Sequence, residues 1–153
     1  MNIAVVNDSG VRSNCRKVRK VATLFLEKAS RLGKCQWGEI SLVLSDDSGI
    51  QDVNSSFLNH DCPTDVISFA YQPMPGDSSA ISGEIIVNLE LAIRLGARFR
   101  GAERELALYI AHGCDHLTGA DDATVSQRRR MRARELRWIK AAEQRGLLEG
   151  LLT

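Results

Sequence analysis

The chain has 153 residues, of which 44% are hydrophobic and 25% are charged, and its net charge is +1. This composition is typical of an ordinary globular protein and excludes a disordered or fibrous one. A chain of this length buries roughly two-thirds of its unfolded surface, so we expect a single domain over residues 1–153 that folds without a metal or a disulfide.

The expected elements alternate between strands and helices in the first half of the chain and are mainly helical in the second. Apolar periodicity and turn residues predict, in chain order, a strand at 2–7, a helix at 13–32, a strand at 37–44, a helix at 48–57, strands at 66–71 and 82–88, and helices at 89–99, 102–118 and 123–145. Loops are predicted at 58–65 and 73–79, where Asn, Asp, Gly and Pro gather. This order predicts an α+β fold, in which about five helices cover a small mixed four-stranded sheet.

Neither a membrane segment nor a cysteine framework is evident. No apolar run approaches the length of a membrane span, and the first residues have no basic segment followed by a long apolar one. We therefore expect a cytoplasmic protein with no membrane partner. The four cysteines are scattered and form no CxxC pair, which indicates buried free thiols rather than a zinc knuckle or a disulfide framework.

Charge is distributed unevenly along the chain. The sequence has no Lys or Arg between Cys35 and Ile93. Basic residues gather instead around the first and last predicted helices, at Arg12, Arg16, Lys17, Arg19, Lys20, Lys28, Arg31 and Lys34, and at Arg128, Arg129, Arg130, Arg132, Arg134, Arg137, Lys140 and Arg145. If these two helices lie side by side, they form a basic surface suited to phosphate backbones. Solvated helix faces without a partner explain the pattern equally well.

A candidate metal site lies at the end of the fourth predicted helix. His112 and His116 are four residues apart, so they project from one face of a helix on consecutive turns. Gly119 can end the helix in the left-handed conformation, and the chain can then fold back to offer Asp121 or Asp122 as a third ligand. Two imidazoles, one carboxylate and an open position for water are typical of a hydrolytic metal site. The alternative is two core or capping histidines on an ordinary helix.

Other residues of the same helix bear on this hypothesis. Glu105 lies two turns before His112 on the same face, where it can support a histidine, although a surface charge is the simpler explanation. Asp115 faces elsewhere, and we expect it to be solvated or to support the site. Gly113 occupies the position at which H-E-x-x-H peptidases carry a glutamate, so a peptidase would lack its proton acceptor.

Three motifs resemble those of one known family. The segment from His112 to Asp122, HGCDHLTGADD, is similar to the signature H-G-x-x-H-L-x-G-x-D-H. The segment from Asn54 to Phe69 is similar to the block N-x-x-(aromatic)-R-x-x-D-x-P-T-D-V-(Leu or Ile)-S-F, and Gly83-Glu84-Ile85 resembles a G-(Asp or Glu)-I strand. The chain thereby resembles the YbeY family of bacterial metal-dependent endoribonucleases and ribosomal RNA maturation factors.

The resemblance implies an α+β fold with the metal site at the end of the motif helix. It also implies a hydrolase that cleaves single-stranded RNA in 16S ribosomal RNA maturation and ribosome quality control, with the ribosome or ribosomal proteins as partners. We expect one zinc ion, or another transition metal, held by His112, His116 and Asp122. In the second motif, we expect Asp65 either to order the loop beside the site or to cap a turn.

Two positions depart from the family's pattern. Asp122 stands where the family has its third histidine, and Asp121 or His60 is the alternative third ligand. Leu58 stands where the family has an arginine that acts on the phosphate, and a leucine cannot donate the bidentate hydrogen bonds that stabilise charge on phosphoryl oxygens. A protonated His60 can supply part of that charge. The sequence therefore predicts metal binding and leaves open an active endoribonuclease, a catalytically weak, metal-pinned factor that binds ribosomal RNA or the ribosome, or a metallopeptidase.

Overall fold

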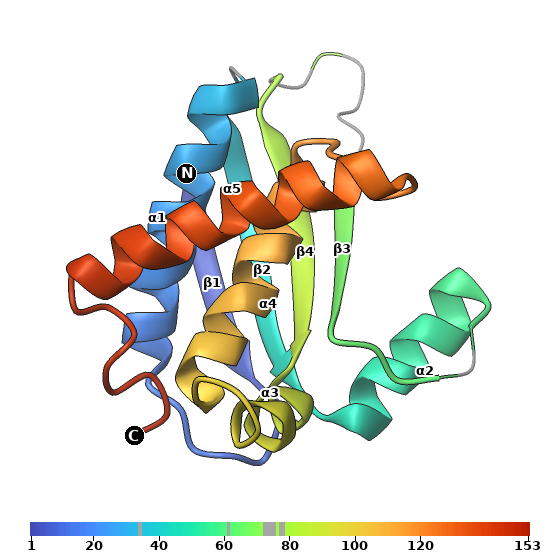
Figure 1. Ribbon diagram of the computed structural model, residues 1–153. Coiled ribbons are helices and arrows are strands. Elements are labelled where there is room, and N and C mark those ends of the chain that lie inside the picture. The colour runs from blue at the N-terminus through green and yellow to red at the C-terminus, as the bar shows by residue number, and fades with distance from the viewer. Residues whose placement is uncertain (34, 61, 72–75, 77–78) are drawn as a thin grey trace.

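The computed structural model describes residues 1–33, 35–60, 62–71, 76 and 79–153, and its elements follow the predicted order (Figure 1). They are β1 (Asn2–Asn7), α1 (Cys15–Gly33), β2 (Trp37–Ser45), α2 (Asp47–Leu58), β3 (Val66–Tyr71), β4 (Ile81–Asn88), α3 (Leu89–Gly96), α4 (Ala102–Leu117) and α5 (Val125–Gln144). The predicted α+β class is therefore confirmed. Asp61 of the second motif and most of the loop predicted at 73–79 lie outside the described residues.

The four strands form one mixed sheet in the order β1-β2-β4-β3. The first three of these are parallel to one another: α1 connects β1 to β2, and the chain passes through α2 and β3 before it reaches β4. β3 pairs with β4 in the antiparallel direction and forms an edge of the sheet. This arrangement confirms the predicted mixed sheet and places the second and third motifs, on β3 and β4, beside each other.

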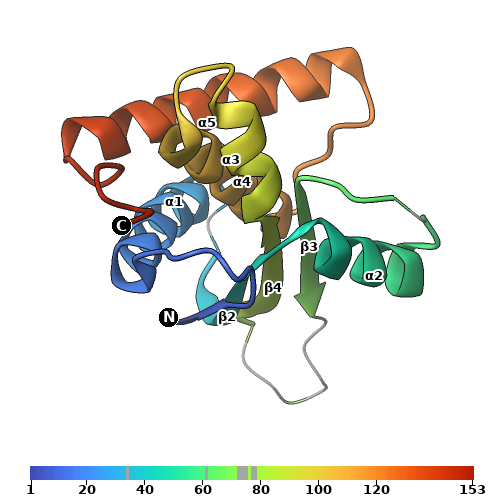
Figure 2. The ribbon, with the colours of Figure 1, turned by 90° about the horizontal axis from the view of Figure 1, so that it is seen from below.

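Most helices lie on one face of the sheet. α1 and α4 pack directly on that face, α3 packs against α4, and α5 crosses α1 and α4 from the outside (Figures 1 and 2). The apolar side chains between these layers form the main core, as Phe25 of α1 and Trp138 of α5 illustrate, with stacked rings 6.2 Å apart. α4 is thus enclosed between the sheet and α5, which explains why most of its residues are buried.

The opposite face of the sheet carries α2. α2 packs there near β3 and β4, where Ile50 meets Ile67 and Ile86 in a small second core. In Figure 2 the helices other than α2 lie on the far side of the sheet from this core. The five helices therefore do not share the sheet evenly.

α3 ends earlier than predicted, at Gly96 rather than Phe99. The chain turns so closely at this point that a Cβ atom on Gly96 would lie 2.4 Å from the Cα atom of Ala102, at the start of α4. The cysteine prediction was partly wrong: all four thiols are free, but only Cys114 is buried. Within the described residues, no helix is both long enough and apolar enough to cross a membrane.

Candidate metal centre

The two motif histidines lie on the last turn and a half of α4. Their Nε2 atoms point at each other and are 3.0 Å apart, because residues four apart on a helix lie one above the other. Between them, the backbone of Gly113 lies against the sheet, and Ser68 of β3 donates a hydrogen bond of 3.0 Å to the carbonyl of Gly113. The second motif therefore fixes the end of the helix that carries the first.

The chain reverses direction directly after α4. Gly119 has a φ of 91°, the left-handed conformation predicted for it, and the turn brings the Ala120 carbonyl to within 3.0 Å of Nδ1 of His116. Asp122 then lies beside the histidines, its Oδ2 atom 3.5 Å from Nε2 of His116 and 3.7 Å from Nε2 of His112. Within the described part of the chain, no side chain between His116 and Asp122 joins this cluster. The turn thus determines which carboxylate reaches the histidines.

The two alternative ligands are placed differently. Asp121 is exposed, and its Oδ1 atom accepts a hydrogen bond of 3.2 Å from the backbone N–H of Ala123. His60 is exposed beyond the end of α2, and among the described residues only His112, His116 and Asp122 form a group whose ligand atoms all lie within 4.8 Å of one another.

Hydrogen bonding sets both histidines in the tautomer that suits a metal. Nδ1 of His112 lies 2.9 Å from Glu135, and Nδ1 of His116 faces the Ala120 carbonyl, so both Nδ1 atoms donate to acceptors. When both rings are neutral, each Nε2 atom carries a lone pair toward the other, and a cation between them can accept both. A tetrahedral zinc site with bonds of about 2.0–2.2 Å has ligand-to-ligand distances of about 3.3–3.5 Å. The observed 3.0, 3.5 and 3.7 Å separations are close to these, so the three side chains fit such a metal.

Glu135 of α5 is the residue beside the site that the sequence analysis missed. Its side chain is only 2% exposed and contacts His112 from the opposite direction to the ligand cluster. Burial alone would lower the pKa of His112, but the hydrogen bond and charge of Glu135 outweigh it, and the pKa is raised. The signal in the sequence was a single carboxylate in the buried stripe of α5, between Met131 and Ile139, since a charge there requires a partner.

Glu105 lines the same groove as His112, on the face that the helical spacing predicted, whereas one alternative for Asp115 is excluded. Asp115 is buried rather than solvated, and both its oxygens accept hydrogen bonds of 2.8–3.2 Å from Arg134 of α5. Burial raises the pKa of Asp115, while the Arg134 guanidinium opposes this shift. Glu105 lies beside Tyr109, whose pKa is raised by burial and by that carboxylate. The carboxylate that contacts His112 comes instead from α5.

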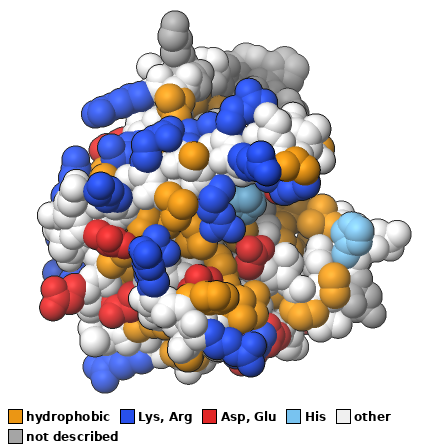
Figure 3. Space-filling view, viewed as in Figure 1, with side chains coloured by type: hydrophobic (Ala, Val, Ile, Leu, Met, Phe, Trp, Pro, Cys, Tyr) orange, Lys and Arg blue, Asp and Glu red, His pale blue; other side chains and the backbone are white. Residues whose placement is uncertain are grey.

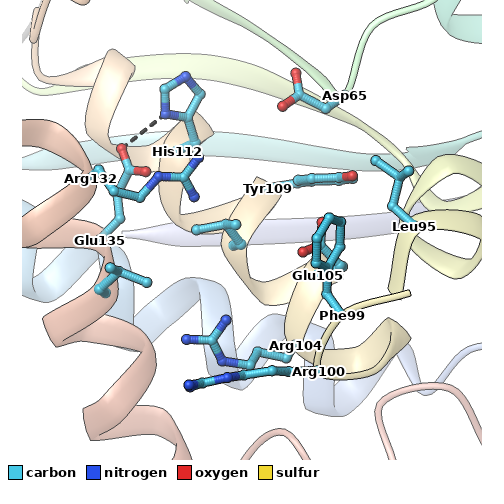
Figure 4. Close-up of a pocket in the computed structure, with 12 residues that line it drawn as sticks. Asp65, Leu95, Phe99, Arg100, Arg104, Glu105, Tyr109, His112, Arg132 and Glu135 are labelled. Atoms are coloured by element: carbon cyan, nitrogen blue, oxygen red, sulfur yellow. Dashed lines mark hydrogen bonds and ion pairs between the residues drawn. The ribbon is translucent and has the colours of Figure 1, made fainter. Parts of the chain in front are cut away.

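The two larger cavities that open onto the histidines are lined by different ones: His112 lines the first and His116 the second. The larger, of about 490 Å³, is a groove between α3, α4 and α5 (Figure 4). It is lined by Asp65, Leu95, Phe99, Arg100, Arg104, Glu105, Leu108, Tyr109, His112, Arg132, Glu135 and Leu136. The other, of about 340 Å³, lies between α2 and β3 and is lined by Asn54, Leu58, Thr64, Val66, Ile67, Ser68 and His116. The predicted departure at Leu58 therefore does face the candidate metal site.

Asp65 connects the second motif to the groove. Its side chain accepts hydrogen bonds from its own neighbours, the Val66 N–H at 2.8 Å and the Thr64 hydroxyl at 3.2 Å, as expected of a residue that orders a turn. In Figure 4 its carboxylate lies across the groove from His112 and above Tyr109. Asp65 thus both orders the loop and borders the site.

In this mixed α+β fold, two histidines and an aspartate converge at the end of a buried helix and form a group that can hold a metal ion. The sequence profile of the family described as "Endoribonuclease YbeY" matches residues 4–143. The chain belongs to this family of endoribonucleases, which are hydrolytic nucleases, and the prediction made from the three motifs is confirmed.

Individual relatives named "Endoribonuclease YbeY" agree with this result. The chain is 39% identical to the one from Syntrophotalea carbinolica over 132 residues, which cover 80% of this chain and 87% of the relative. It is 37% identical to the one from Elusimicrobium minutum, covering 74% and 82% respectively. It is 35% identical to the one from Rhodopirellula baltica, with 73% of this chain aligned to only 58% of the relative's length.

A solved structure supports the fold independently. The solution structure of a protein from Thermotoga maritima superposes with a TM-score of 0.63 and covers 94% of this chain and 92% of that protein, at 20% identity. The α+β architecture is therefore shared by a chain of very different sequence.

Proposed function

We propose that this chain is a metal-dependent endoribonuclease that cleaves single-stranded RNA, and that His112, His116 and Asp122 hold the metal. The observation that carries the proposal is the pair of Nε2 atoms 3.0 Å apart, with a carboxylate oxygen 3.5 and 3.7 Å away. Two imidazoles and one carboxylate leave a fourth tetrahedral position free, which is the pattern of catalytic rather than structural sites.

Zinc is the metal we propose, because the donors are two nitrogens and one oxygen in a near-tetrahedral arrangement. A divalent metal at this position supplies positive charge for a phosphodiester and a water of lowered pKa. The protein's own part is to hold the ligands. Glu135 fixes the tautomer of His112, the Ala120 carbonyl fixes that of His116, and the turn at Gly119 brings Asp122 into place.

We propose ribosomal RNA as the substrate, in line with the family. The ribosome or ribosomal proteins are then the partners that we propose. The arrangement of basic residues supports an RNA partner. Arg19 and Lys20 of α1 share a surface cavity with Arg145, just past α5, so the two basic helices meet as the sequence analysis required. In Figure 3 Lys and Arg side chains gather along the upper half of this face, over α5, above a hollow that contains a histidine. We also propose that the protein is cytoplasmic, in line with this substrate.

A second candidate function rests on Leu58. It lines the cavity beside His116 at the position of the family's arginine, and it is 43% exposed. A chain without that cation would bind metal and RNA but cleave the RNA slowly. If the cation is what limits this chain, Leu58→Arg will raise the rate of RNA cleavage by about a hundredfold or more.

The structure gives a reason to reject the metallopeptidase hypothesis. A Cβ atom at Gly113 would lie 2.6 Å from Cγ2 of Ile85 and 3.1 Å from Cγ2 of Val66, so no glutamate fits at this position. The helix that carries the histidines packs against the sheet where a peptidase carries its proton acceptor.

The test combines metal analysis with RNA cleavage. Purified wild-type protein should contain one metal ion per chain and cleave a single-stranded RNA, and chelation should abolish the cleavage. His116→Ala should lose both the metal and the cleavage, whereas His60→Ala, a histidine outside the cluster, should lose neither. If His116→Ala keeps its metal, the assigned site is wrong. If metal-loaded wild-type protein binds RNA without cutting it, the second candidate function is correct.

A further inference from the structure

One arginine beside the candidate metal site has no partner within the described residues. Arg132, on α5, lines two cavities that are also lined by His112. One is the groove described above, and the other is a smaller cavity of about 110 Å³ that is also lined by Asp122. Among the described residues, its guanidinium forms no hydrogen bond or ion pair, and its side chain is exposed. Figure 4 shows it on the same wall of the groove as Glu135, below His112.

Three neighbouring arginines are engaged. Arg134 is paired with Asp115, and Arg104, across the groove, is paired with Glu143 at 3.2 Å. Arg128 donates to the backbone carbonyl of Asp122 at 3.1 Å and so holds the turn that carries this carboxylate. Among the described residues, Arg132 is therefore an arginine that has no hydrogen bond or ion pair and lines both the groove and the smaller cavity at His112.

The groove itself suits a nucleotide. Phe99, which is 69% exposed, provides an aromatic ring, and leucines of three helices provide apolar walls for a base or a ribose. Arg100 lies at the far end of the groove from His112, in the position of a second phosphate contact (Figure 4). Arginines lie at both ends of the groove, and the apolar walls between them are interrupted by the carboxylate of Glu105. The arginines and the apolar walls match a short segment of single-stranded RNA.

We propose that Arg132 binds the scissile phosphate and supplies the positive charge that Leu58 cannot, and that the groove between α4 and α5 holds the nucleotide next to that phosphate. This proposal rests on the proposed endoribonuclease function. The guanidinium reaches the site from α5, in the groove lined by His112, whereas Leu58 lines the cavity at His116. A forked donor beside a metal binds two phosphoryl oxygens at once and stabilises the charge that develops on them. In this proposal, the arginine that binds the scissile phosphate comes from α5 rather than from α2.

The test compares Arg132→Gln with Arg130→Gln. Arg130 is an exposed arginine of the same helix, two residues away and so on a different face, and it is absent from the residues that line the two cavities at His112. Arg132→Gln should lower kcat for RNA cleavage by about a hundredfold or more, which is the cost of losing one donor to developing charge. It should also weaken binding of a single-stranded RNA oligonucleotide and reduce the slope of log affinity against log salt by about 0.7. Metal content and thermal unfolding should not change, because the side chain is exposed and unpaired.

The conservative variant separates charge from packing. Arg132→Lys keeps a point charge and should keep RNA affinity within about threefold, while it recovers only part of kcat because lysine lacks the fork. The proposal is overturned if Arg132→Gln and Arg130→Gln behave alike, or if Arg132→Lys binds RNA as poorly as Arg132→Gln. A hundredfold gain on Leu58→Arg in the otherwise wild-type chain would also overturn it, since the charge would then be missing.

The two proposals fail in different ways. If metal-loaded wild-type protein does not cleave RNA, the endoribonuclease proposal fails, and the proposed role of Arg132 in the reaction fails with it. If the wild-type protein cleaves RNA and Arg132→Gln cleaves it equally well, only the inference about Arg132 fails.

Discussion

The buried contact between Glu135 and His112 allows the sharpest test of the metal centre. Glu135→Gln keeps the shape of the side chain and an oxygen that can accept the Nδ1–H bond, but it removes the negative charge. That charge makes Nε2 of His112 a stronger donor to a metal. Residues that orient metal ligands in this way typically contribute 10- to 100-fold to metal affinity.

The structure favours the lower end of this range. The hydrogen bond of 2.9 Å can persist in the variant, so only its charge-assisted part is lost. We therefore expect zinc to bind about tenfold more weakly, which corresponds to about 1.4 kcal/mol. The stability of the metal-free protein should change less, because the substitution also removes the repulsion between Glu135 and the nearby carboxylate of Asp115.

The assay is a competition titration of zinc against a chromophoric chelator at pH 7. Glu143→Gln is the matched control, because Glu143 lies on the same helix but is exposed and paired with Arg104. In the metal-free protein, an NMR titration should also show a lower pKa of His112 in Glu135→Gln, since Glu135 raises it in the wild type. Zinc affinities of Glu135→Gln and wild type that agree within twofold would refute the argument that Glu135 strengthens the ligand.

The remaining predictions concern the third ligand, the helix contact and one surface cluster. Asp122→Ala should weaken metal binding by at least tenfold in the same titration, whereas Asp121→Ala should not change it, since only the first carboxylate faces the histidines. Gly113→Ala should lower the free energy of unfolding by about 1–3 kcal/mol in urea titrations, because its Cβ atom would lie 2.6 Å from a methyl group of β4, and an unchanged midpoint would contradict the close packing. Hydrogen bonds from Arg94 and from a buried asparagine lower the pKa of Asp47 from 3.8 to about 2, so this stabilisation is present above about pH 4 and is lost as the pH falls toward 2. Asp47→Asn should therefore lower the free energy of unfolding by about 1 kcal/mol at pH 7 after solvent screening, and by progressively less as the pH falls through about 2. A loss independent of pH would show that the charge is not its cause.

Much of the fold was readable in the sequence because local patterns specify it. Alternating apolar residues identified β2, and three- and four-residue spacings identified α1 and α4 within a few residues of their observed ends. The ends moved where tertiary contacts decide them, as at Gly96, where the start of α4 leaves no room for a side chain. The uneven cover of the sheet was not predictable, because an apolar stripe on a helix does not say which face of the sheet it meets.

The candidate site divides in the same way. The sequence by itself determined the two histidines, because their spacing of four places them on one helical face, and it determined the turn, because Gly119 tolerates a positive φ. Only the tertiary structure decided what surrounds them. Glu135 and Arg132 come from α5, twenty or so residues further along the chain, and nothing in local periodicity relates them to His112. The packing of α5 across α4 brings a buried carboxylate to the imidazole of His112 and places in the adjoining groove a guanidinium that has no partner among the described residues, and this depends on the whole fold.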